Sequence, residues 1–130
     1  MLIDTHIWVW WVNGDPQLKP EYQAAITAAQ QTGIEVSIIS CWEVSKLVGN
    51  KRLTLTLPVL DWLEAALSYA GVRLLPLTPE IVAASTQLPG TFHKDPADQL
   101  IVATARMHGL ALMTMDEKII AYPHVPLVAV

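Results

Sequence analysis

Five acidic residues stand where the predicted strands end and the predicted helices begin. Asp4 ends a first apolar strand, Glu43 lies in the first turn after a second strand, and Asp116 directly follows a later one. Asp95 and Asp98 open a long helix, and their spacing of three lets them share one helix face. Carboxylates are the ligands that Mg²⁺ and Mn²⁺ prefer. These residue types therefore point to a site for a hard divalent cation.

Each acid, taken singly, is also typical of a helix cap. Asp95 precedes a proline at the first helical position, which is a common helix start. Ser40 and Glu43 have the spacing of a capping box. Asp4 and Asp116 also precede predicted helices. Local sequence alone therefore leaves capping and metal binding open for every one of these residues.

Considered together, the acids favour a metal site. Converging carboxylates without matching Lys or Arg repel one another, and a bound cation relieves that repulsion. No His or Cys spacing typical of zinc ligands competes with them. We expect each of the four scattered histidines to be a surface or packing residue rather than a ligand: His6, His93, His108 and His124.

The elements that must position these acids are short strands that alternate with helices. Strands are predicted over 1–4, 35–39, 73–77, 110–115 and 127–130, and helices over 5–13, 21–31, 40–48, 57–70, 79–87 and 96–108. Such alternation predicts a three-layer α/β domain with a five-stranded parallel sheet flanked by helices. The carboxyl ends of parallel strands share one edge, where ligands bind. We therefore expect the acids to converge at that edge.

Composition narrows the class of protein. The 130 residues suit a single domain over 1–130, and a chain that is 52% hydrophobic and 15% charged is not disordered. The lone Cys41 and the lack of a signal peptide or of about 20 consecutive apolar residues predict a cytoplasmic protein that does not enter a membrane. A net charge of −4 argues against nucleic acid, unless bound cations neutralise several of the acids.

Four segments resemble the motifs of PIN-domain nucleases, in the family's order and with matching separations. They are LIDTHIWVW, VSIISCWEVSKL, HKDPADQLIVATARMHGL and ALMTMDEKI, and together they cover the chain from Leu2 to about Tyr122. The likeness is strongest to VapC-type toxins of bacterial toxin–antitoxin systems. It implies a PIN-like sheet that carries a quartet of acids around one or two Mg²⁺ or Mn²⁺ ions.

The resemblance also implies a role for individual residues. The four catalytic and metal-binding acids match Asp4, Glu43, Asp98 and Asp116. Asp95 matches a further acid found in a subset of relatives, where it could bind metal, place water or cap the helix. Thr5 and Thr114 match hydroxyl positions that support the acids. The implied reaction is metal-assisted hydrolysis of RNA phosphodiester bonds, which leaves a 5′-phosphate.

One departure from the family pattern concerns how phosphate is held. Relatives usually carry Arg after the helix Asp, where this chain has Gln99. The cations that could replace it are Lys46, Lys94 and Arg106, and Lys46 is the preferred candidate because it lies three residues after Glu43. Its alternative role is that of an ordinary solvated helix charge.

The resemblance implies two protein partners, a second copy of the chain in a homodimer and an antitoxin whose segment fills the acidic groove. Five tryptophans could serve such contacts, although core packing is the more common use of Trp and base stacking is a third alternative. Trp8 and Trp11 share a face of the first helix, and Trp10 points elsewhere. We hypothesise that this helix contributes to a partner surface.

Two other functions compete with the nuclease. A PIN domain that has lost activity could act as a binding module, and the Gln99 departure keeps this alternative open. A metal-dependent phosphatase or a receiver-like domain also has acids at strand ends. The first would require an Asp where His6 stands, and the second an Asp where Thr78 stands, so both fit poorly.

Overall fold

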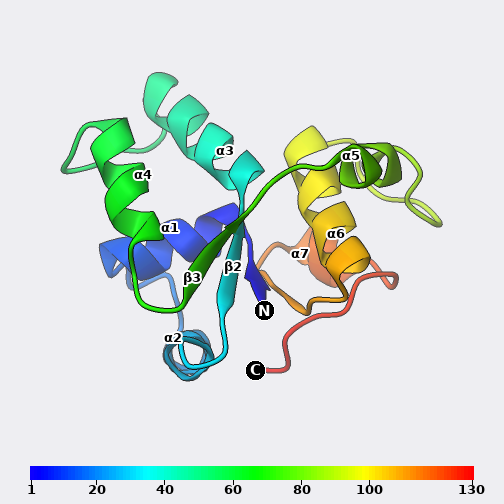
Figure 1. Cartoon of the computed structure of the whole chain (residues 1–130), viewed down its shortest axis with the longest axis horizontal. Coiled ribbons are helices and arrows are strands. Elements are labelled where there is room, and N and C mark those ends of the chain that lie inside the picture. Colours follow the sequence, from blue (N-terminus) through cyan, green and yellow to red (C-terminus); the bar gives the residue numbers. More distant parts are fainter.

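The computed structural model describes all 130 residues, which form one sheet with helices on both sides (Figure 1). The elements follow in the order β1 (Leu2–Ile3), α1 (Thr5–Asn13), α2 (Pro20–Ala29), β2 (Ile34–Ser37), α3 (Ile38–Gly49), α4 (Val59–Leu67), β3 (Val72–Leu75), α5 (Pro79–Ser85), α6 (Pro96–His108), β4 (Leu112–Met113) and α7 (Glu117–Ile120).

The sheet has four parallel strands in the order β3-β2-β1-β4. β1 lies at its centre, where Leu2 pairs with Glu35 of β2 on one side and with Leu112 of β4 on the other. All four strands therefore end at one edge, as the alternation of strands and helices predicted. Asp4 and Thr114 directly follow β1 and β4 at this edge, and α3 follows β2 there.

The predicted fifth strand over 127–130 is wrong. The structure has a single parallel bridge in its place, between Leu112 and Leu127. Two backbone hydrogen bonds flank this bridge, from Leu112 N to the Pro126 carbonyl at 2.8 Å and from Val128 N to the Leu112 carbonyl at 3.0 Å. Pro126 has no N–H to donate, so the pairing does not extend toward the preceding residues.

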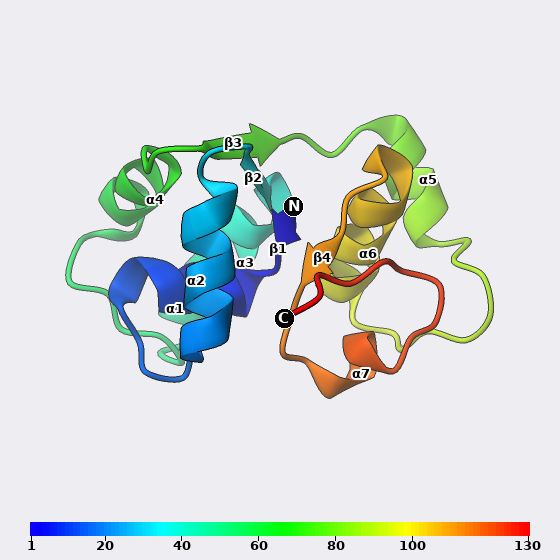
Figure 2. The same ribbon diagram turned by 90° about the horizontal axis from the view of Figure 1, so that it is seen from below.

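The predicted three layers are confirmed, because two separate cores pack against opposite faces of the sheet. Side chains alternate between the faces along each strand. Ile3 and Met113 join a core formed mainly with α1, α2 and α4, whereas Leu2 and Leu112 join a core formed with α6 and α7. Figures 1 and 2 show these two groups of helices on opposite sides of the strands.

Most of the tryptophan side chains pack in the core that contains Ile3 and Met113. Trp8 is fully buried and packs edge-to-face against Trp62, with ring centroids 5.1 Å apart. The Trp62 indole N–H donates to Asn13 at 3.0 Å, whereas the Trp8 indole N–H has no partner. Trp11 is half-buried against Tyr69. The shared face of Trp8 and Trp11 is thus largely a packing face, and the hypothesis that α1 forms a partner surface stays untested.

Helix ends follow local sequence signals closely at two places. α1 and α6 have the predicted bounds, since each has an aspartate N-cap and ends at a glycine with φ of 63°. α3 begins two residues earlier than predicted, with Ser37 as its N-cap through a bond to Ile39 N. The capping-box interpretation of Ser40 and Glu43 is therefore wrong. No helix is both long and apolar enough to cross a bilayer.

Candidate active site

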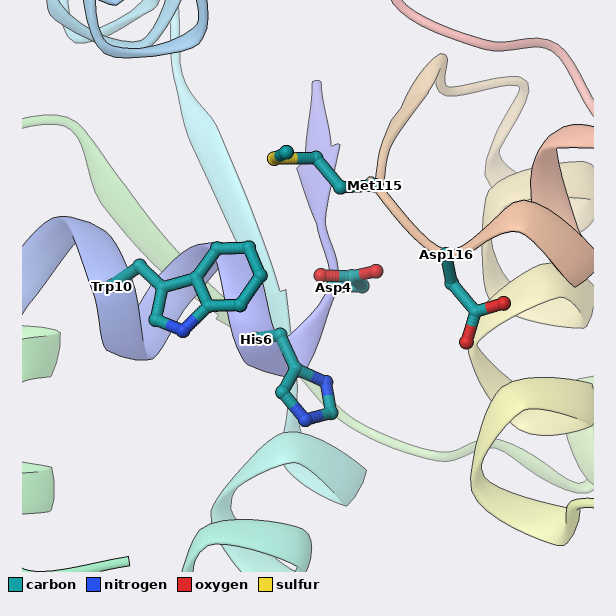
Figure 3. A pocket seen from close by; sticks show the side chains of 5 residues that line it. All are labelled: Asp4, His6, Trp10, Met115 and Asp116. Atoms are coloured by element: carbon teal, nitrogen blue, oxygen red, sulfur yellow. The ribbon is translucent and has the colours of Figure 1, made fainter. Parts of the chain in front are cut away.

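Asp4 is the most buried of the predicted acids. It follows β1, its backbone N–H donates to the Met113 carbonyl of β4 at 3.1 Å, and 5% of its surface is exposed. Its carboxylate accepts the Ile7 N–H at 3.0 Å and so caps α1. The capping role is confirmed, and the carboxylate also lines a hollow with His6, Trp10, Met115 and Asp116 (Figure 3).

The surroundings of Asp4 oppose its ionisation. Burial raises the pKa of its carboxyl from 3.8 to about 6, and the negative charge of Asp98 adds to that shift. Hydrogen bonds from the Thr114 hydroxyl and the Ile7 amide act in the opposite direction, as does nearby His6. A carboxylate held in such surroundings is stabilised by any cation that approaches it.

Glu43 is brought to Asp4 through Thr5, the residue that follows Asp4. The buried Thr5 hydroxyl donates to Glu43 Oε1 and shares a 2.8 Å hydrogen bond with the Ser40 hydroxyl. Thr5 therefore connects the end of β1 to α3, and its supporting role in the site stays a prediction. Burial raises the pKa of Glu43, the Thr5 bond lowers it, and the charges of Asp98 and Asp95 raise it further.

Asp95 and Asp98 have different roles at the start of α6. Asp95 is exposed, and its Oδ1 accepts the Asp98 backbone N–H at 3.1 Å, so the capping interpretation is confirmed for Asp95. The Asp98 carboxylate instead contacts His93, with Nε2 and Oδ2 2.7 Å apart and each side chain 20% exposed. Burial raises the pKa of Asp98, which the His93 bond partly offsets.

This contact of His93 with Asp98 differs from the surface or packing role predicted for the histidine. His93 and Asp98 lie five residues apart in one of the family-like motifs, and this shared motif is the sequence signal that could have indicated the contact. Gln99 also belongs to this arrangement, because its amide donates to the His93 carbonyl at 3.1 Å. Gln99 thus links the loop that carries His93 to α6.

Asp116 is exposed and lies across the hollow from His6 and Trp10 (Figure 3). Its carboxylate accepts the Lys118 N–H at 2.8 Å, which confirms its capping role at α7. The buried Thr114 hydroxyl accepts the Asp116 N–H at 3.0 Å and shapes the turn after β4. Thr114 therefore lies beside both Asp116 and Asp4, and its supporting role stays a prediction.

The acids influence one another, but their side chains do not close around a single point. Asp98 raises the pKa of both Asp4 and Glu43, and Asp116 raises that of Asp98. Asp4 and Asp116 line one hollow, whereas Glu43 and Asp95 line another. No three His, Cys, Asp or Glu side chains stand close enough to hold one ion as placed. Binding an ion would therefore require the carboxylates to turn toward it.

The donor set nevertheless suits a hard divalent cation. No Lys or Arg forms a salt bridge with these five acids, and the only acid paired with such a cation is Glu35 of β2, which binds Arg73 and the N-terminal amine. Their negative charge is therefore uncompensated by protein cations. Carboxylate oxygens are the ligands that Mg²⁺ and Mn²⁺ prefer. A divalent ion would offset the burial and the neighbouring negative charges that raise the pKa values of Asp4, Glu43 and Asp98.

The three cations considered as replacements for the missing Arg are placed differently. Lys46 lines the hollow of Glu43 and Asp95, with Nζ 4.5 Å from the centre of the Trp42 ring. Arg106 donates to the His124 carbonyl in the last turn of α6, at the end opposite to Asp98, and is excluded. Lys94 is exposed and makes no side-chain hydrogen bond or salt bridge.

Comparison with known proteins gives concordant results. The PIN domain family matches residues 1–125. Ribonuclease VapC22 of Mycobacterium tuberculosis is 36% identical over 124 residues, which are 95% of this chain and 92% of that protein. The fold resembles VapBC2 from Rickettsia felis bound to a promoter DNA fragment, with a TM-score of 0.72, 19% identity and coverage of 98% and 96%. It also resembles a toxin–antitoxin complex from Klebsiella pneumoniae, with a TM-score of 0.66, 23% identity and coverage of 98% and 95%.

Proposed function

This chain belongs to the PIN-domain family, and on that premise we propose that it is an endoribonuclease and the toxin of a toxin–antitoxin pair. The relative that is 36% identical along almost its whole length is a ribonuclease. The proposal takes residues 1–130 as one PIN domain. The observation that carries it is the group of uncompensated carboxylates at the carboxyl ends of β1 and β4, in the second turn of α3 and at the start of α6.

The proposed catalytic and metal-binding residues are the four acids that match the family quartet: Asp4, Glu43, Asp98 and Asp116. When bound, a divalent cation neutralises charge on the phosphate and makes a water molecule a better nucleophile. Asp4 presents its carboxylate at the end of β1, where the Ile7 N–H engages Oδ1. Thr5 occupies Oε1 of Glu43 and leaves Oε2 free for the ion. His93 holds one oxygen of Asp98 in the same way.

Mg²⁺ or Mn²⁺ is the proposed ion, and RNA is the proposed substrate. Hydrolysis at phosphorus that leaves a 5′-phosphate follows the family pattern. Asp95 is proposed to cap α6 and to keep Asp98 at its first turn, because its Oδ1 accepts the Asp98 N–H. Its other oxygen is proposed as a further ligand to the ion.

The proposed partners are an antitoxin and a second copy of the chain. A protein of the same fold is part of a toxin–antitoxin complex, which supports an antitoxin partner here. The exposed hollow between His6, Trp10 and Asp116 is a surface that an antitoxin segment would have to cover to block the acids.

The proposal is tested by incubating the purified protein with a mixed RNA pool in Mn²⁺, in Mg²⁺ and in chelator. We expect cleavage with either ion, none with chelator, and none for Asp4→Asn or Asp98→Asn. Asp61→Asn is the matched control, because Asp61 is an exposed acid on α4, and it should cleave like the unaltered protein. Intact RNA under every metal condition would favour a silent binding module instead.

A further inference from the structure

Arg52 lies between two hollows that flank the candidate site. One hollow is lined by Glu43 and Asp95 together with Trp42 and Lys46. The other is lined by Thr5, His6 and Trp10 among others. Arg52 and Leu47 line both of them, so the two hollows meet at Arg52.

The second hollow continues toward Asp4. Its residues His6 and Trp10 also line the hollow that contains Asp4 and Asp116. Figure 3 shows the His6 and Trp10 rings on the side of Asp4 that faces away from Asp116. Three neighbouring hollows therefore share lining residues: Arg52 joins the hollow of Lys46, Glu43 and Asp95 to the second one, and His6 and Trp10 join the second to the hollow of Asp4 and Asp116.

The backbone places Arg52 at this junction by a reversal after α3. Lys51 has φ of 59° and is the only non-glycine residue with positive φ. The Arg52 N–H then donates back to the Leu47 carbonyl at 2.9 Å. The Lys51 N–H donates to the Val48 carbonyl at 3.1 Å as well, so the two bonds close α3 in a Schellman motif, which requires a left-handed residue at Lys51. The turn holds Arg52 over the last turn of α3 instead of letting the chain leave along the helix axis.

Arg52 is also the one arginine without a protein partner. Arg73 binds the Glu35 carboxylate, and Arg106 donates to the His124 carbonyl. Arg52 is exposed and makes no salt bridge or side-chain hydrogen bond, although acids line the neighbouring hollow. Its guanidinium is therefore free to bind a ligand anion, and its planar donors match a phosphate in a bidentate manner.

The side chains on either side of Arg52 suit a single-stranded nucleic acid. Trp42 is 49% exposed beside Lys46, and Trp10 is half-buried with the His6 ring 5.9 Å away. Aromatic faces that alternate with cations are the usual means of binding unpaired bases and their phosphates. A groove with this composition fits RNA better than an apolar peptide.

We propose that Arg52 binds a phosphate of the RNA strand next to the one that is cleaved. The strand runs from Trp42 and Lys46 past Arg52 to His6 and Trp10. This inference rests on the proposed ribonuclease function and adds the path of the substrate to it. Arg52 acts as a binding and positioning residue and does not take part in the chemical step.

The test compares the binding of a labelled, mixed-sequence single-stranded RNA across a salt series, in Mg²⁺ and with Asp98→Asn present throughout to prevent cleavage. Arg52→Ala should weaken binding about tenfold or more. It should also make the slope of log K against log salt shallower by about 0.7, the change expected for one lost phosphate contact on a single strand. Arg52→Lys should keep the salt-dependence slope of the unaltered Arg52 protein, because it keeps the positive charge. It should recover only part of the RNA affinity, because lysine lacks the paired planar donors of the guanidinium group.

Lys19→Ala is the control, because Lys19 is an exposed cation at the start of α2 that lines none of these hollows, and it should leave affinity and slope unchanged. In the protein that retains Asp98, Arg52→Ala should raise KM more than it lowers kcat.

An Arg52→Ala variant that binds RNA like its parent would overturn the inference while leaving the nuclease intact. A protein that neither binds nor cleaves RNA would overturn the proposed function and the inference together. Lost antitoxin binding with unchanged RNA binding would reassign Arg52 to the protein partner and likewise overturn the inference.

Discussion

Thr5 donates a hydrogen bond to Glu43 across 38 positions of sequence, and this bond joins the end of β1 to α3. It fixes one oxygen of Glu43 and opposes the burial that raises the pKa of this carboxyl. The relationship gives Thr5 a function in the site although it has no ionisable group.

Thr5→Val keeps the shape of this buried side chain and removes the hydroxyl. We expect cleavage of RNA to fall about tenfold or more, because groups that orient metal ligands typically contribute that much. Thr5→Ser retains a hydroxyl and should retain most of the activity. The measurement is the initial rate of cleavage in Mn²⁺. Equal rates for the Val and Ser variants would show that the bond to Glu43 has no functional role.

His93→Ala removes the partner of the Asp98 carboxylate. We expect the affinity for Mn²⁺ to fall about 10- to 100-fold, since Asp98 would lose the contact that orients it. Calorimetric titration with Mn²⁺ measures this directly, without relying on activity. His93→Gln can still donate to Asp98 and should recover part of the affinity.

His108→Ala serves as the control for that experiment, because His108 is exposed at the far end of α6. If the His93 and His108 variants bind Mn²⁺ alike, the 2.7 Å contact with Asp98 does not contribute to the metal site.

The raised pKa of Asp4 predicts how the stability of the metal-free protein depends on pH. The unfolded chain releases this proton near pH 3.8 and the folded chain near 6, so the free energy of unfolding should fall as pH rises between these values. The loss amounts to about 3 kcal/mol and is complete above about pH 6. Below pH 3.8 both states are protonated, and no penalty remains.

Urea unfolding in chelator across this pH range checks the prediction. Asn at position 4 cannot ionise, so the free energy of unfolding of Asp4→Asn should decline less over this range. Glu35, whose pKa is lowered by its cationic partners, contributes a change of opposite sign, but it does so in both proteins and cancels in their difference. A stability that rises from pH 4 to pH 6 equally in both proteins would contradict the burial argument for Asp4.

Two tryptophan substitutions separate packing from surface roles. Trp8→Ala should lower the free energy of unfolding by about 3–5 kcal/mol, because the indole is fully buried against Trp62. Trp42→Ala should lower it by about 0.5 kcal/mol, since half of that side chain is exposed. Chemical unfolding of both variants at one pH is the measurement. Similar losses would mean that Trp42 has a packing role that its exposure does not reveal.

Local sequence determined the ends of α1 and α6 and the kind of site that lies between them. An aspartate followed by a helix and closed by glycine is a signal confined to a few residues, so 5–13 and 96–108 were predicted without knowledge of any neighbour. Asp4, Glu43 and Asp116 follow predicted strands in the sequence itself, which predicted their common edge once the strands were taken as parallel.

Tertiary structure decided everything that depends on contacts between distant residues. Local sequence does not predict that β1 lies between β2 and β4, or that a single bridge replaces the expected fifth strand. It also does not predict that Asp4 is more buried than Asp116. Nor does it reveal that His93 turns toward Asp98 or that the reversal at Lys51 leaves Arg52 between two hollows. Hydrophobic periodicity and capping signals report the conformation of neighbouring residues, whereas strand order and side-chain surroundings follow from packing energies summed over the whole molecule.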